Sequence, residues 1–166
     1  MTYFSQLRAS ALKEISTKRI GTAVFTRIVA EVSADHGHLL ESATQGVLLA
    51  EEFLSKSVTY VFVTGDIEKG QMSAQLDLDG GRTGLITVGI LRDRPRLDVL
   101  VVGNRGTIQH SPARDALAGR IDEGPLSIDD ATTKQRRSDR HAAVRSALEK
   151  ALANRTRTAV GKRGEG

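Results

Sequence analysis

The sequence has no cysteine and no tryptophan, and among its 166 residues there are only three prolines, two tyrosines and four phenylalanines. The absence of cysteine excludes disulfides, thiolate metal ligands and cysteine nucleophiles. With so few aromatic side chains, a core has to be built from Val, Leu, Ile and Ala. No apolar run approaches the ~20 residues of a membrane span, and the N-terminus lacks a signal-peptide pattern. We therefore expect a soluble, cytoplasmic protein of domain size without a membrane partner.

The net charge of +4 is concentrated near the C-terminus, because ten Lys and Arg but only three Asp and Glu follow residue 133. Basic clusters supply non-specific affinity for nucleic acids. This segment also carries an apolar stripe, however, and it has no aromatic side chain on which a base could stack. The stripe consists of Val144, Ala147, Leu148, Ala151 and Leu152. We expect residues 126–160 to form a basic helix that packs on the protein, residues 161–166 to be a disordered tail, and nucleic acid to be the least favoured partner.

The periodicity of apolar residues changes several times along the chain. Residues 23–32 alternate as a half-buried strand does, and one face carries Val24, Thr26, Ile28, Ala30 and Val32. Asp79-Gly80-Gly81 predicts a hairpin turn, since glycine tolerates the positive φ such turns need. The pattern predicts helices at 3–18 and 39–54, and strands at 23–32, 59–64, 72–78, 82–90, 96–102 and 107–110.

This order of elements predicts an α+β fold over residues 1–125, with a mainly antiparallel open sheet and helices packed on one face. Parallel connections need long crossovers, and the hairpin-linked strands between residues 59 and 110 leave no room for them. The strands at 82–90 and 97–102 are apolar enough to need cover on both faces. We therefore expect the protein not to be a monomer.

Five stretches resemble, in order, the C-terminal substrate-side domain of the Gfo/Idh/MocA family of NAD(P)-dependent sugar and polyol oxidoreductases. They are the helix that closes on Ile20-Gly21, GHLLESATQGVLLAEEFL at 37–54, the hairpin at 72–81, DVLVVGNRGTI at 98–108 and, more weakly, the helix at 142–160. The family commonly has Gly, an apolar pair, Asp, three residues and His at the start of the second stretch. Here Glu41 stands at the Asp position and Gln45 at the His position.

The resemblance implies that His38, Glu41 and Gln45 lie nearest a sugar or polyol ligand. Glu41 and Gln45 are four residues apart and so share a helix face. An amide can bind a hydroxyl but cannot take up a proton, so we predict no catalytic residue on this chain. Without the resemblance, the two residues would read as a solvated polar stripe. His110 and His141 show no obvious partner in the sequence.

The family's dinucleotide-binding half has no counterpart here. Gly80-Gly81 and the pair Gly103 and Gly106 lie between predicted strands rather than between a strand and a helix. We expect this chain to bind no cofactor itself, with NAD(P) bound by a separate Rossmann-type chain. His36 and His38 invite a metal hypothesis, but no further ligand at suitable spacing completes it, so no metal site is predicted.

Two functional hypotheses remain open. The first is a non-catalytic or accessory subunit of a split NAD(P)-dependent sugar or polyol oxidoreductase. The second is a stand-alone homo-oligomeric module, such as a homodimer formed through the sheet, for ligand binding or assembly. The chain could also be a piece of a longer protein.

Overall fold

The computed structural model describes residues 3–32, 37–90, 96–111 and 134–161. Three helices and seven strands are found in these ranges. The helices are α1 (Tyr3–Ser16), α2 (Gly37–Leu54) and α3 (Lys134–Asn154). The strands are β1 (Ala23–Val32), β2 (Val58–Asp66), β3 (Gln71–Leu78), β4 (Arg82–Ile90), β5 (Arg96–Gly103), β6 (Thr107–His110) and β7 (Thr158–Ala159).

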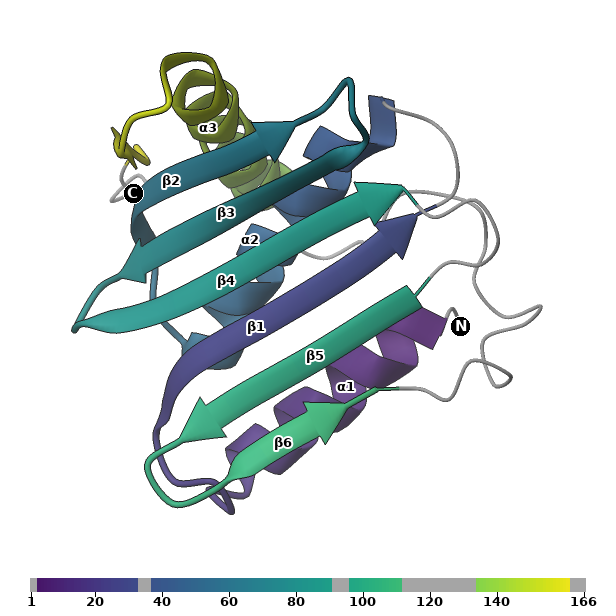
Figure 1. Cartoon of the computed structure of the whole chain (residues 1–166). Coiled ribbons are helices and arrows are strands. Elements are labelled where there is room, and N and C mark those ends of the chain that lie inside the picture. The colour runs from purple at the N-terminus through teal and green to yellow at the C-terminus, as the bar shows by residue number, and fades with distance from the viewer. Residues whose placement is uncertain (1–2, 33–36, 91–95, 112–133, 162–166) are drawn as a thin grey trace.

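The strands form one open sheet in the order β6-β5-β1-β4-β3-β2-β7. The β1–β4 pair is parallel and all other neighbouring pairs are antiparallel. All three helices lie behind the sheet in Figure 1, so none of the described helices lies on the opposite face. The predicted α+β class, with a mainly antiparallel sheet and helices on one face, is confirmed.

Strand β1 lies inside the sheet, between β5 and β4, and follows the predicted alternation with one correction. Ile28, Ala30 and Val32 are buried beneath the helices as expected. Val24, which was predicted to face the core, is 40% exposed. The pairing of β1 with β5 shifts register between Ala23 and Phe25, and this β-bulge turns Val24 outward and leaves Ala23 buried.

Helix α2 packs on the centre of the sheet through the predicted apolar stripe. Leu40, Ala43, Val47, Ala50 and Leu54 are all buried. The helix comes so close to β4 that a Cβ atom at Gly46 would lie 2.7 Å from Cγ2 of Ile86. The opposite side of α2 faces away from the sheet, and it is this side that carries the polar residues of interest.

The C-terminal segment differs from the prediction of a helix up to residue 160. Helix α3 ends at Asn154, and Arg155 has a left-handed backbone with a φ of 52°. The chain then reverses, and β7 pairs with the edge of β2, with Tyr60 opposite Ala159. Residues 126–133 and 162–166, for which a helix start and a disordered tail were predicted, lie outside the described residues. None of the described helices is long and apolar enough to cross a membrane.

Candidate functional site

A polar cluster joins the outer side of α2 to α3. Glu41 Oε1 accepts a hydrogen bond from Gln45 Nε2 at 2.8 Å and lies 2.7 Å from Nε2 of His141. Its second oxygen, Oε2, accepts from Nη1 of Arg145 at 3.3 Å. The side chains of Glu41 and His141 are 23% and 28% exposed. One carboxylate therefore holds an amide, an imidazole and a guanidinium at a partly buried position.

The environment of Glu41 favours its charged form. Partial burial acts to raise its pKa, but the hydrogen bonds from Gln45 and His141 and the positive charges of His141 and Arg145 outweigh burial and lower the pKa below its ordinary value. Glu41 is therefore a carboxylate at neutral pH. In that form it accepts hydrogen bonds and donates none.

An open cavity of about 770 Å³ lies beside this cluster, between α1, α2 and α3. Gln45 and His141 are among its lining residues, and Glu41, which contacts both, is not in the lining. The remaining lining residues are Leu12, Leu48, Glu51, Glu52, Ser55, Lys56, Ser57, Asp79, Ser138 and Arg140. The mixture of hydroxyl, amide and charged groups suits a polar ligand.

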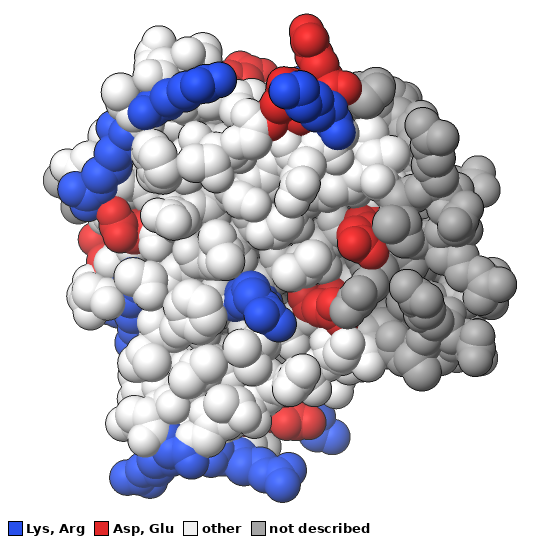
Figure 2. Space-filling view, viewed as in Figure 1, with Lys and Arg blue, Asp and Glu red and all other residues white. Residues whose placement is uncertain are grey.

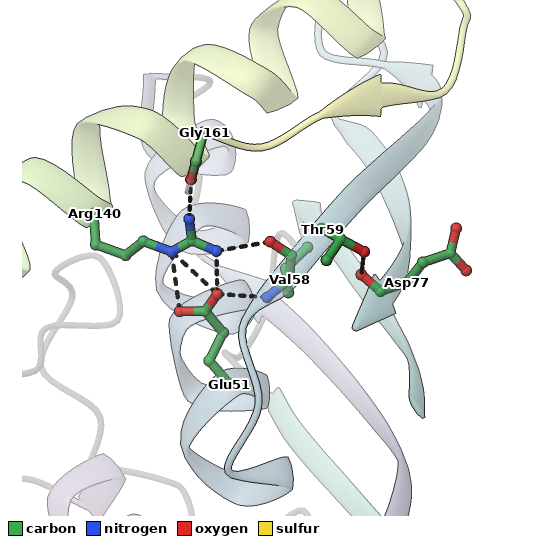
Figure 3. A network of polar contacts seen from close by, with 6 residues as sticks. All are labelled: Glu51, Val58, Thr59, Asp77, Arg140 and Gly161. Carbon is green, nitrogen blue, oxygen red and sulfur yellow. Dashed lines mark hydrogen bonds and ion pairs between the residues drawn. The ribbon is translucent and has the colours of Figure 1, made fainter. Parts of the chain in front are cut away.

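A nearly buried ion pair fixes α3 against α2 at the wall of this cavity (Figure 3). Arg140 contacts both carboxylate oxygens of Glu51, and the side chains of Arg140 and Glu51 are only 3% and 10% exposed. Arg140 also donates to the backbone carbonyls of Val58, at 2.8 Å, and Gly161. Glu51 Oε1 in turn accepts from the Val58 amide at 2.7 Å. The network ties α2, α3, the start of β2 and Gly161, two residues after β7, together, and so it holds α2 and α3 in place.

The predicted site residues have different places in the structure. Gln45 lines the cavity, and Glu41 shares its helix face, as the four-residue spacing indicated. The side chain of His38, which lies in the first turn of α2, is outside the described residues. The roles of His38, Glu41 and Gln45 in substrate binding stay predictions.

His141 and Arg145 were missed by the sequence analysis. The sequence showed no obvious partner for His141, and in the structure Glu41 lies 2.7 Å from its imidazole. The two residues are 100 positions apart in the chain, and no local pattern links them. The one available signal was that His141 and Arg145 lie four residues apart and so share one side of a predicted helix.

The glycine turns singled out in the sequence lie between strands of the sheet. The turns at Gly80-Gly81 and at Gly103 to Gly106 join antiparallel strands, so neither presents a helix N-terminus to a phosphate. Within the described ranges, no group of three or more His, Asp or Glu side chains is arranged to hold a metal.

The sequence matches no protein-family model and no curated protein. The fold does match solved structures. Scyllo-inositol dehydrogenase from Lactobacillus casei, solved with NAD(H) and scyllo-inositol, aligns with a TM-score of 0.69 over 98% of this chain and 65% of its own, at 12% identity. Myo-inositol 2-dehydrogenase from Lactobacillus plantarum aligns with a TM-score of 0.70 over 93% of this chain and 61% of its own, at 11% identity.

A third structure, myo-inositol dehydrogenase from Lactobacillus casei in complex with NAD(H) and myo-inositol, has a TM-score of 0.66 and 12% identity. The alignment covers 96% of this chain and 60% of that enzyme. Nearly the whole chain therefore shares its fold with part of these dehydrogenases, and it spans less than two thirds of their length.

Proposed function

We propose that this chain is the substrate-side, accessory domain of a split NAD(P)-dependent polyol or sugar oxidoreductase of the Gfo/Idh/MocA type. The cavity bordered by Gln45 and His141 holds part of the polyol, and a separate Rossmann-type chain binds NAD(P). The observation that carries the proposal is the position of the predicted Glu41–Gln45 pair at a polar cavity in a fold shared with inositol dehydrogenases.

The chemistry of the cavity supports a polyhydroxy ligand. Gln45 donates through Nε2 to Glu41, and no described residue donates to its amide oxygen. Ser55, Ser57 and Ser138 add hydroxyl groups to the lining. Such groups both donate and accept hydrogen bonds, as a vicinal diol does. The buried Arg140–Glu51 pair fixes the wall without offering an unpaired charge to the ligand.

The glycine turns support placing the cofactor on another chain. The glycine turns described above join antiparallel strands and lack the helix N-terminus that binds a pyrophosphate. We therefore derive no hydride-transfer step from this chain. In the proposed complex it contributes ligand contacts, and the partner contributes NAD(P).

Ligand binding is tested by titrating the purified chain with myo-inositol and scyllo-inositol while amide signals are followed by NMR. We expect shifts that map to the cavity lining, and a Gln45→Ala variant with affinity reduced by about fivefold, the cost of one net hydrogen bond. Gln75→Ala is the matched control, because Gln75 is exposed on β3. Equal effects of the two substitutions, or no binding by the unaltered chain, would count against a polyol site.

The split-enzyme role is tested by capturing the tagged chain from its native cytosol and identifying co-purified proteins by mass spectrometry. We expect a chain with a dinucleotide-binding fingerprint, and polyol-dependent reduction of NAD(P) only when both chains are mixed. Recovery of this chain with copies of itself alone would favour the stand-alone module.

We propose self-association through the open sheet face both for a split-enzyme subunit and for a stand-alone module. Figure 2 shows this face, where most of the described surface is neither acidic nor basic. The strand registers bring Leu85 and Leu100 to either side of Arg27, and Phe25 lies opposite Val102. These apolar side chains are only half-buried, since none of the helices that the structure describes covers them. A second copy of the same face is the occupant we propose, because it would cover these residues in both chains.

Sedimentation velocity at micromolar concentration tests this assembly. We expect a species larger than the 17.9 kDa chain, and its dissociation by Leu85→Glu. Ala9→Glu, on an exposed position of α1, is the control and should leave the assembly unchanged. A single species of about 18 kDa for the unaltered protein would refute self-association through the sheet.

A further inference from the structure

His141 lines the cavity next to Glu41, a position that no pattern in the sequence indicated. Histidine is the side chain that gains and loses a proton most readily near neutral pH. His141 is the one histidine among the described residues that line the cavity. The predicted site on α2 offers only an amide there, Gln45. Helix α3 therefore brings an imidazole to a cavity whose other ionisable lining residues are Glu51, Glu52, Lys56, Asp79 and Arg140.

The contact with Glu41 determines which imidazole nitrogen carries the hydrogen. Glu41 is charged and can only accept, so the 2.7 Å contact places a hydrogen on Nε2 of His141. In the neutral imidazole, the other nitrogen, Nδ1, is then an acceptor. No described residue donates a hydrogen bond to Nδ1.

The charged groups nearest the imidazole are paired, and Glu52, which lines the same cavity together with Lys56 and Asp79, pairs with Arg8 of α1 at 2.6 Å. Arg145 reaches Glu41 from α3, and Glu149 binds Arg145 at 3.2 Å. Arg140, the residue before His141, is paired with Glu51 from α2. Glu41 is therefore the charged group in direct contact with the ring, and His141 keeps 28% of its side chain exposed at the cavity.

We propose that Glu41 and His141 form a ligand-binding dyad, in which Glu41 holds the imidazole with its hydrogen on Nε2 and Nδ1 accepts a hydrogen bond from a ligand hydroxyl. Only the neutral imidazole can do this, so a proton on Nδ1 competes with the ligand. The ligand class rests on the function proposed above. Glu41 acts as a positioning residue, and His141 and Gln45 contact the ligand.

The competing explanation of the Glu41–His141 contact is that it only holds α2 and α3 together. It would use the same 2.7 Å contact but would give ligand binding no dependence on the protonation of His141. The two explanations therefore differ in the pH profile of binding and in the imidazole tautomer. Both quantities can be measured on the isolated chain.

The experiment uses ¹⁵N-labelled protein and myo-inositol. Imidazole ¹⁵N–¹H correlation spectra, assigned with His141→Gln, give the tautomer and the pH midpoint at which His141 titrates. Inositol affinity is measured on the same samples between about pH 5 and pH 8, the range in which histidines change charge. His110→Gln, in β6, is the matched control and should change neither the His141 spectrum nor the affinity profile.

We expect the hydrogen on Nε2 above the midpoint, and affinity that falls by up to about tenfold per pH unit below it, the limit for one competing proton. His141→Gln should bind about fivefold more weakly at high pH and lose the pH dependence. A hydrogen on Nδ1, or wild-type binding that does not follow the His141 midpoint, overturns the dyad while leaving the polyol site intact. Absence of inositol binding at every pH, with the hydrogen on Nε2, refutes the polyol class and leaves only the Glu41-held tautomer.

Discussion

Replacing Arg140 with methionine should be among the most destabilising single changes in this chain. Methionine fills much of the same space but removes the charge and all the donors. Glu51 would keep only its hydrogen bond from the Val58 amide, with its side chain 10% exposed. The carbonyls of Val58 and Gly161 would each lose a donor.

The expected cost follows from leaving a carboxylate uncompensated at a nearly buried position. Removing one partner of a buried ion pair typically costs about 3–5 kcal/mol. A domain of this size is stable by about 5–15 kcal/mol in total. With a urea m-value of about 2 kcal/mol/M, the loss corresponds to a midpoint lowered by ~2 M.

Urea unfolding followed by circular dichroism measures this shift. Lys150→Met is the matched control, because it removes a long cation from an exposed position of the same helix and should change stability by less than about 0.5 kcal/mol. Adding Glu51→Gln to Arg140→Met removes the orphaned charge and keeps an acceptor for the Val58 amide. The double variant should therefore regain stability relative to Arg140→Met alone.

Two results would refute this reasoning. One is a loss below about 1 kcal/mol for Arg140→Met, which would mean that solvent already screens the pair well. The other is a double variant no more stable than Arg140→Met, which would show that lost packing rather than the uncompensated Glu51 charge dominates the effect.

Two further predictions concern a tight turn and the pH dependence of stability. Gly103→Ala places a Cβ atom 2.1 Å from the carbonyl oxygen of Ile20, whereas the Cβ atom of Gly106→Ala meets nothing closer than 3.8 Å. In thermal unfolding, Gly103→Ala should therefore lose about 1–3 kcal/mol of stability, and Gly106→Ala should not. Similar melting temperatures for both variants would contradict this. Because the folded-state pKa of Glu41 is below its ordinary value of 4.5, its ionisation stabilises the fold above that pH, and this contribution is lost as pH falls through the lowered pKa. The stability difference between wild type and Glu41→Gln should therefore shrink from pH 7 to below pH 4.5, and a difference constant with pH would show that Glu41 is not held in its charged form.

Much of the secondary structure could be predicted because it depends on neighbours in the sequence. The predicted bounds of β1 and of β4 are those observed. The hairpin turn at Gly80-Gly81 follows from a local need for positive φ, with observed values of 76° and 74°. The buried stripe of α2 follows from helical periodicity alone.

The errors occurred where a distant strand decides the local conformation. Val24 is turned outward because β1 shifts register against β5, about 75 residues further along the chain. Strand β7 has only two residues, and it is a strand because the edge of β2 offers it backbone partners. The continuation of a helix through residue 160 had no local signal against it apart from the polar, threonine-rich composition of residues 154–158.

The sequence alone determined the class of the fold, the apolar faces of its elements and the shared helix face of Glu41 and Gln45, because each depends on spacing within one segment. The tertiary structure decided the rest of the site. It brought His141 and Arg145 of α3 to Glu41 of α2, and it paired Arg140 with Glu51 beside the cavity. Contacts between residues about 90 to 100 positions apart exist only once both helices pack on the same face of the sheet, so no pattern along the chain could specify them.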